Sequence, residues 1–251
     1  ILLLPDRRRD KRYRKMNNVP IVFKREMISY FYSPIAYIVI AVFLVFSGYF
    51  FARILALTQQ ATLTYSLANT QFILSILAPV MTMKLLSEEV RSGTIEMLMT
   101  APVTDFEVVF GKFLAALFLY LVMLAPTLLY VVFLNWVGKP DIGPIISSYI
   151  GLALMGSMFV SVGLLMSALT KNQVVAGVTG IVTLVILFFA GYAVSGTEGW
   201  YVAALQYIGT YDHWESFTKG LVDTRDVVYY ISITALCIFI AVRIVESRKW
   251  R

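Results

Sequence analysis

The sequence predicts an all-α integral membrane protein with six transmembrane helices. Of its 251 residues, 59% are hydrophobic and only 14% are charged, and the mean hydropathy is +0.77. A typical soluble domain is about 45–50% apolar and about 25% charged. Six apolar stretches also approach or exceed the length that crosses a bilayer as a helix, about 17–25 residues. This composition leaves little room for a soluble catalytic or nucleotide-binding domain.

The N-terminal segment is strongly basic, and we expect residues 1–18 to be a cytoplasmic tail preceding a single transmembrane domain over residues 19–251. Seven of its residues are Lys or Arg, which favours contact with anionic lipid. Ile1–Leu4 is too short for the apolar core of a signal peptide, so no cleaved signal is expected. Met16 is a candidate start, which would make residues 1–15 an extension.

The next segment, Val19–Ser33, has the pattern of an amphipathic elbow helix that lies in the membrane surface and ends before Pro34. Four apolar residues share one face, while Lys24 and Arg25 lie elsewhere on the helical wheel. The four apolar residues are Phe23, Met27, Ile28 and Phe31.

Six apolar stretches follow as predicted spans. They are residues 35–51, 70–86, 113–135, 145–169, 174–194 and 227–242. The prolines at 79 and 126 predict kinks within the second and third spans. Counting Lys and Arg by alternating loops places 17 on one side and four on the other, so both termini are expected in the cytoplasm. We therefore expect a multi-pass protein of the cell inner membrane.

The chemistry missing from the spans narrows the function. The apolar cores contain no Asp, Glu, Arg or His, which argues against a proton pump or an ion-coupled carrier. A single cysteine, Cys237, excludes an internal disulfide, and a single histidine, His213, makes a histidine-rich metal site implausible. Small residues at helix-packing spacing favour close helix contacts over a substrate site. They are Ala153, Ser157, Ser161, Ala176 and Gly180.

The loop between the second and third spans has the pattern of a short docking helix. Gly93 and Thr94 predict a turn and an N-cap, and Glu96 would then lie in the first helical turn, where a negative charge suits the helix dipole. An apolar stripe of Ile95, Leu98 and Met99 follows, and Pro102 ends the helix. Residues 104–107, Thr-Asp-Phe-Glu, form a capping box that begins the next helix.

This loop resembles the cytoplasmic loop of ABC-2-type (type V) exporter permeases. The motif is Glu88-Glu89, Gly93-Thr94-x-Glu96-x-Leu98, Pro102 and Gly111-Lys112. Residues 24–37 are similar to that family's elbow and first span. Residues 213–230 and 246–250 are similar to its gliding-motility-associated branch, and the whole resemblance covers nearly everything after Met16.

The resemblance implies a permease subunit of an ATP-driven exporter that pairs with a second permease, identical or homologous, and couples to separate ABC ATPase subunits. The residues implied in ATPase coupling are Glu88, Glu89, Arg91, Gly93, Thr94, Ile95, Glu96, Leu98, Met99 and Pro102. Gly111-Lys112 is not part of a P-loop, so we expect no enzymatic activity on this chain. ATP and Mg would be bound by the ATPase, and no nucleic acid or metal partner is expected.

An alternative function stays open. In a gliding-motility-like machine, the same subunit would transmit ATP-driven motion to the cell envelope without passing cargo, together with an auxiliary membrane protein that has a periplasmic domain.

The outer loop from Ser195 to Asp226 is too rich in Trp, Tyr and Leu for a plain linker, and residues 200–205 and 214–221 are predicted as short helices. The family's re-entrant helices occupy this position. Charged residues here are interpreted as holding the loop to the last span, with a substrate gate as the alternative. These residues are Glu215, Asp223, Arg225 and Asp226. His213 is included in the possible gate, and a catalytic or metal role for it is disfavoured because the chain has no second histidine.

Overall fold

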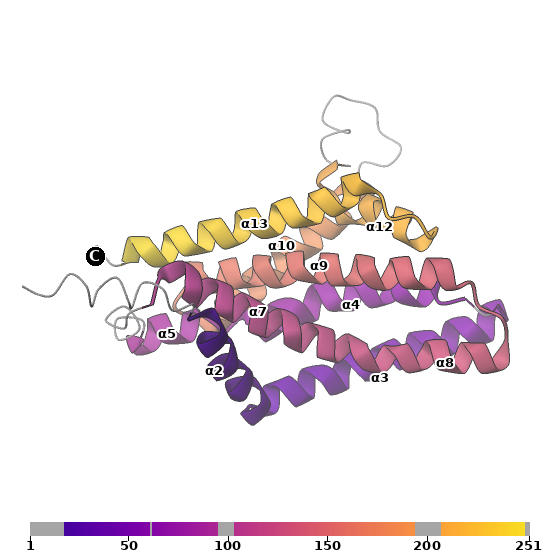
Figure 1. Ribbon diagram of the computed structural model, residues 1–251, viewed down its shortest axis with the longest axis horizontal. Helices are drawn as coiled ribbons and strands as arrows, with labels where there is room; N and C mark the ends of the chain where they lie inside the picture. Colours follow the sequence, from indigo (N-terminus) through magenta and orange to yellow (C-terminus); the bar gives the residue numbers. More distant parts are fainter. Residues whose placement is uncertain (1–17, 61, 95–102, 194–206, 249–251) are drawn as a thin grey trace, which may run out of the picture.

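The computed structural model describes residues 18–60, 62–94, 103–193 and 207–248, and every element in these ranges is helical (Figure 1). The α-helices are α2 (Val19–Tyr32), α3 (Pro34–Thr58), α4 (Thr64–Thr82), α5 (Ser87–Ser92), α7 (Asp105–Leu124), α8 (Leu128–Val137), α9 (Ile142–Leu169), α10 (Gln173–Ala193), α12 (Thr210–Thr218) and α13 (Thr224–Ser247). The basic tail, the apolar stripe of the docking loop and residues 200–205 lie outside the described ranges.

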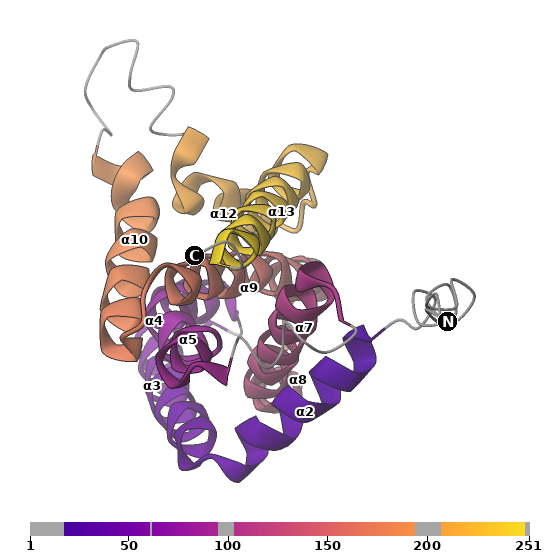
Figure 2. The ribbon, with the colours of Figure 1, turned by 90° about the vertical axis from the view of Figure 1, so that its left-hand side faces the viewer.

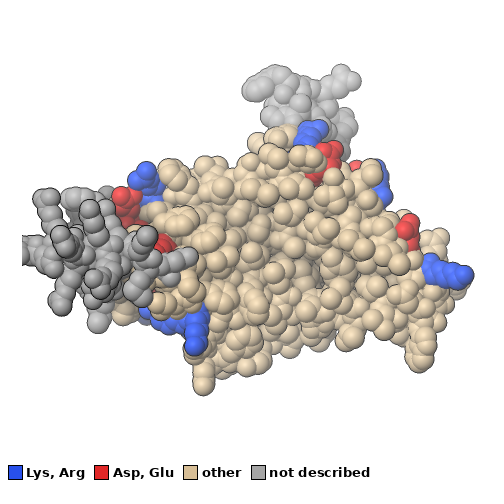
Figure 3. All heavy atoms as spheres, in the orientation of Figure 1, with Lys and Arg blue, Asp and Glu red and all other residues tan. Residues whose placement is uncertain are grey.

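The prediction of six spans is confirmed, because six helical stretches are long and apolar enough to cross a membrane. They are Pro34–Thr58, Thr64–Ser92, Asp105–Val137, Ile142–Leu169, Gln173–Gly191 and Thr224–Ser247. On the face drawn in Figure 3, charged residues gather toward the two ends of the molecule and leave an uncharged middle. This distribution is the one that a bilayer requires of a spanning bundle.

The predicted boundaries were too short at several ends. The third span begins at Asp105 rather than at residue 113, because its capping box starts the helix two turns before the apolar run. Pro126, where a kink was predicted, lies in a 3-10 turn, η1 (Ala125–Thr127), that separates α7 from α8. At Pro79, by contrast, α4 continues as one helix.

Helix α9 forms the centre of the bundle, with α4, α7, α10 and α13 packed around it (Figure 2). Glycines allow the closest contacts. A Cβ atom on Gly163 would lie 2.1 Å from Thr82 Oγ1, and one on Gly156 would lie 2.1 Å from a ring carbon of Tyr120. Gly180 of α10 packs against Pro79 in the same way. Backbones that approach this closely are typical of membrane helix interfaces.

The segment predicted as an elbow forms the separate helix α2, which runs across the long direction of the spans (Figure 1). It ends at Ser33, whose backbone is extended, and Pro34 begins α3. The predicted apolar stripe divides between two environments. Met27 is buried against the bundle and Phe23 is partly buried, whereas Ile28 and Phe31 are exposed.

Candidate functional site

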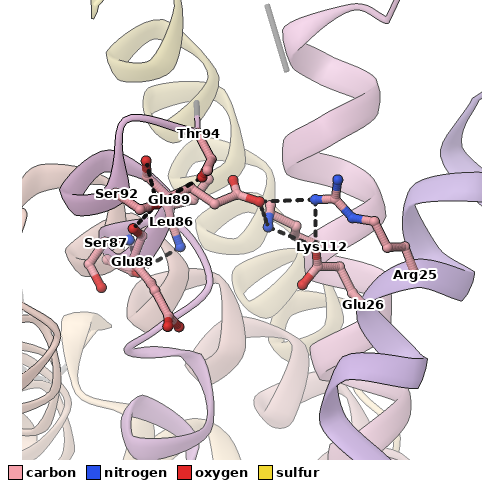
Figure 4. A network of polar contacts seen from close by, with 10 residues as sticks. Arg25, Glu26, Leu86, Ser87, Glu88, Glu89, Ser92, Thr94 and Lys112 are labelled. Atoms are coloured by element: carbon pink, nitrogen blue, oxygen red, sulfur yellow. Dashed lines mark hydrogen bonds and ion pairs between the residues drawn. The ribbon is translucent and has the colours of Figure 1, made fainter. Parts of the chain in front are cut away.

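Four charged side chains from three helices meet at the end of the bundle where α2, α5 and α7 converge (Figure 4). Lys112 Nζ on α7 donates to Glu26 Oε1 on α2 at 2.9 Å and to Glu89 Oε1 on α5 at 2.8 Å. Arg25 donates to the same two oxygens at 3.1 and 3.0 Å. We call these four residues the charge network.

The charge network is largely shielded from solvent. The Lys112 side chain is only 2% exposed, and those of Glu26 and Glu89 are 12% and 15% exposed. A buried ammonium is costly unless it is paired, and here two carboxylates surround it. With Arg25 the four formal charges cancel. Burial raises the pKa of Glu26, but the charges and hydrogen bonds of Lys112 and Arg25 outweigh burial and lower it overall.

Helix α5 is too short to hold its position by itself and is anchored from α9. Ser167 Oγ accepts hydrogen bonds from the backbone N–H groups of Leu86 at 3.0 Å and Ser87 at 3.1 Å, and it donates to the Met83 carbonyl at 2.9 Å. These are donors at the start of α5 that lack partners within the helix. A serine on the central helix α9 therefore holds the start of α5, the helix that carries Glu89.

The end of α5 confirms one prediction from the docking loop. Gly93 has φ 72°, the left-handed conformation that glycine adopts readily, so the predicted turn is present. Thr94 Oγ1 lies 2.8 Å from Ser92 Oγ. The helix that Thr94 was predicted to cap, with Ile95, Glu96, Leu98, Met99 and Pro102, lies outside the described residues.

The start of α7 is tied to the start of α2. Thr104 and Glu107 form the predicted capping box, with Glu107 Oε2 accepting from the Thr104 backbone at 2.8 Å. Glu107 Oε1 also accepts from the Asn18 backbone at 3.1 Å. One turn further, Gly111 allows close approach, because a Cβ atom there would lie 2.8 Å from Val22 Cβ. This contact brings α2 near enough for Glu26 to reach Lys112.

A cavity of about 380 Å3 opens beside the charge network. Besides the four network residues, charged and hydroxyl side chains line it, including Lys84, Glu88, Ser92 and Thr94. Of the predicted coupling residues that the structure describes, Glu89 lies inside the network, whereas Glu88 and Arg91 are exposed. Lys112 and Glu26 were missed as a pair. The available signal was a lysine directly before the apolar run predicted as the third span, together with a glutamate in the preceding amphipathic helix.

The residues predicted as a possible gate lie at the opposite end of the bundle, around α12. They do not converge on one site. His213 pairs with Asp226, and the Arg225 guanidinium lies 5.1 Å from the centre of the Tyr207 ring. Asp223 instead caps α13, and Glu215 of α12 pairs with Lys219, which directly follows that helix. Within the described residues, no group of three or more His, Cys, Asp or Glu is placed to hold a metal ion.

The six apolar helices define a multi-pass membrane protein whose short loop helix is clamped between two others. A family model described as ABC-2 family transporter protein matches residues 21–234, so the chain belongs to the ABC-2 transporter family. It is accordingly a membrane permease subunit of an ABC transporter, a family generally partnered by ABC ATPases. The comparison with curated proteins found no match.

Proposed function

We propose that this chain is one half of an ATP-driven exporter, pairing with a second permease subunit and coupling at its α2–α5 end to two separate ATPase subunits. ATP and Mg would bind to the ATPases, and the family generally consists of non-catalytic membrane subunits. The observation that carries this proposal is the charge network, because it joins the loop helix α5 to both α2 and a membrane span.

The coupling argument is mechanical. Residues 95–102 directly follow α5, and their stripe of Ile95, Leu98 and Met99 is apolar. A force applied there passes to Gly93 and α5, then through Glu89 and Lys112 into α7, and through Arg25 into α2. The Ser167 bonds carry it into α9 as well. An ATPase that binds the stripe would therefore move several helices together.

We place the α2–α5 end in the cytoplasm of a cell with an inner membrane, following the excess of Lys and Arg on that side. In this orientation α2 lies in the membrane surface, with the exposed side chains of Ile28 and Phe31 in lipid. Tyr32 and Tyr37, 86% and 55% exposed, would stand at the interface between lipid and water. Helix α12 would then lie at the outer surface, where a re-entrant position is compatible with its buried Trp214 and Phe217.

Within the family, we favour the gliding-motility-associated branch, whose members would work with an auxiliary membrane protein carrying a periplasmic domain. The cargo of such an exporter would be a lipid-linked, polysaccharide, peptide or amphipathic substrate. Purification with the products of neighbouring genes tests the branch. A purified complex that acts as an exporter should move cargo across vesicle membranes when ATP is supplied. A complex that only transmits motion should hydrolyse ATP together with its auxiliary protein but move no cargo.

The deciding experiment replaces Leu98 with Asp in the chain co-expressed with its ATPase. We expect the variant to insert and to pair with the second permease, but to lose ATPase co-purification and stimulated hydrolysis, because a charge would enter the apolar contact. The matched control is Lys171→Glu, an exposed charge change in the α9–α10 turn at the same end of the bundle. Wild-type complex formation by Leu98→Asp would refute the coupling proposal.

Orientation is tested separately by thiol labelling. Cys237 is first replaced by Ala, and the exposed positions Gln60 and Thr94 are changed to Cys one at a time. We expect an impermeant reagent to label position 60 in intact cells and position 94 only after permeabilisation. Labelling of position 94 from outside would overturn the orientation.

A further inference from the structure

The chain's single histidine joins α12 to the start of α13, at the end of the bundle opposite the charge network. His213 Nδ1 lies 2.7 Å from Asp226 Oδ1, and His213 Nε2 lies 2.9 Å from the backbone oxygen of Tyr207. The two residues are 4% and 5% exposed. We call His213, Asp226 and the Tyr207 carbonyl the histidine clasp.

The partners of the ring determine how many protons the histidine clasp contains. A backbone carbonyl only accepts hydrogen bonds, so Nε2 must carry a proton to make its contact. At Nδ1, a proton must also lie between the ring and the carboxyl group for the 2.7 Å contact to be a hydrogen bond. On Nδ1 or on the carboxyl oxygen, this second proton gives the clasp one proton more than a neutral imidazole beside a carboxylate has.

Removing one proton breaks one of the two contacts whichever tautomer remains. If the neutral ring keeps its Nδ1 proton, the Nε2 lone pair faces the Tyr207 oxygen. If it keeps its Nε2 proton, the Nδ1 lone pair faces the Asp226 carboxylate. Two acceptors at these distances repel each other, and burial prevents water from relieving the conflict.

The groups around the ring do not supply an alternative donor. From α13, Tyr229 stacks on the imidazole with ring centres 3.9 Å apart, and its hydroxyl donates to the Ile208 carbonyl. Tyr230 donates to the Thr210 carbonyl, and Tyr207 meets the imidazole edge to face with the Arg225 guanidinium over its own ring.

The remaining elements packed against α12 bring no described charge to the ring. Glu215 of α12 is exposed and pairs with Lys219. Helix α10 contributes the Leu187 carbonyl, which accepts from Thr210, and α9 contributes Ser147, which donates to the Phe217 carbonyl at 2.6 Å. Asp212 is next to His213 in the chain, and its side chain lies outside the described residues.

The two ends of α12 are held differently. Its C-terminal half is fixed by buried Phe217, which packs on Gly151, where a Cβ atom would lie 2.7 Å from the ring. Its N-terminal half is held to α10 by the Thr210 hydroxyl and to α13 by the histidine clasp and the Tyr229 hydroxyl. Loss of the clasp would therefore loosen the start of α12 from α13, while its contacts with α9 and α10 stayed in place.

We propose that the histidine clasp is a proton-binding switch, which holds the start of α12 against α13 when the pair carries this second proton and loosens it when that proton leaves. The sign follows from linkage. The closed form binds one proton more than the opened form, so closing weakens as pH rises. Acid closes the switch and alkali opens it.

The first test reads the proton directly. Because the chain has one histidine, the purified protein labelled with 15N-histidine gives one imidazole pair in its NMR spectrum. In an acidic sample, we expect Nε2 to carry a proton and Nδ1 to share a hydrogen-bonded proton with Asp226. The absence of a proton between Nδ1 and Asp226 in that sample would overturn the proposal.

The second test measures opening by hydrogen exchange in lipid nanodiscs between about pH 6 and about pH 9, a range that begins near the ordinary histidine pKa. After correction for the intrinsic exchange rate, protection of the amides in residues 210–214 should fall by up to about tenfold per pH unit, since one proton is linked to closing. Amides of residues 215–218 should respond less.

Matched variants separate titration of the clasp from general loosening. The double variant His213→Phe with Asp226→Asn keeps a stacked ring and leaves no buried charge, and its protection should not depend on pH. Glu215→Gln in the same helix should keep the wild-type response. A flat wild-type profile, or an equal slope in the double variant, would refute the switch. Neither test involves an ATPase or cargo, so it stands or falls separately from the exporter proposal.

Discussion

Replacing Lys112 by methionine removes the central cation of the charge network while keeping an unbranched apolar stem of similar length. The change leaves Glu26 and Glu89, with side chains only 12% and 15% exposed, next to each other. Arg25 still bridges them, but its side chain is 54% exposed, so its compensation is worth about 1 kcal/mol or less. We therefore expect a loss of stability close to that of a broken buried pair.

The size of the loss can be estimated from the contacts. Lys112 makes two charge-assisted bonds of 2.9 and 2.8 Å. Removing one partner of a buried ion pair costs about 3–5 kcal/mol, and we take about 3 kcal/mol because Arg25 remains. For a chain of this size, 1 kcal/mol shifts the Tm by about 2–4 °C, so Lys112→Met should lower it by about 6–12 °C.

The assay is thermal unfolding of the detergent-solubilised protein at one fixed scan rate, since membrane proteins commonly unfold irreversibly. The triple variant that adds Glu26→Gln and Glu89→Gln should recover much of the loss, because no unpaired buried charge remains. Arg25→Ala should lower the Tm by only about 1–4 °C. If Lys112→Met unfolds within about 2 °C of the wild type, the network contributes little, and the reasoning is wrong.

Three further predictions concern single residues of the charge network and of the bundle interior. The pKa of Glu26 is lowered in the folded chain, so the ionised Glu26 stabilises the fold above its ordinary pKa of 4.5. This stabilisation is lost as the pH falls below 4.5. The drop in Tm on acidification should therefore be smaller in Glu26→Gln than in the wild type. Gly156→Ala should destabilise the protein by about 1–3 kcal/mol, because the new Cβ would meet the buried Tyr120 ring. The matched control is Gly177→Ala, whose Cβ would lie 3.3 Å from the flexible sulfur of Met83. Equal Tm values for the two variants would contradict the packing. Gln71 is fully buried, and neither polar atom of its amide group has a hydrogen-bond partner within the described residues. Gln71→Leu should therefore raise the stability by about 1–3 kcal/mol in the same assay. A decrease in stability would show that the amide is hydrogen-bonded.

Several features were predictable from the sequence because they depend on residues close together in the chain. The six spans follow from the length of apolar runs, since a backbone in lipid must satisfy its own hydrogen bonds locally. The boundary at Pro34, the turn at Gly93 and the capping box of Thr104 and Glu107 each rest on a few neighbouring residues. These predictions are confirmed, apart from the exact ends of the spans.

Other features were decided only by the tertiary structure. Lys112 meets Glu26 and Glu89 from 86 and 23 residues away, and His213 meets Asp226 because α12 folds back onto α13. Local spacing cannot reveal such pairs. Nor could it show which face of each span is buried, because lipid and the interior of the bundle are both apolar and hydropathy does not distinguish them. The inner faces were selected instead by shape, as where Gly156 receives the Tyr120 ring and Gly163 receives Thr82.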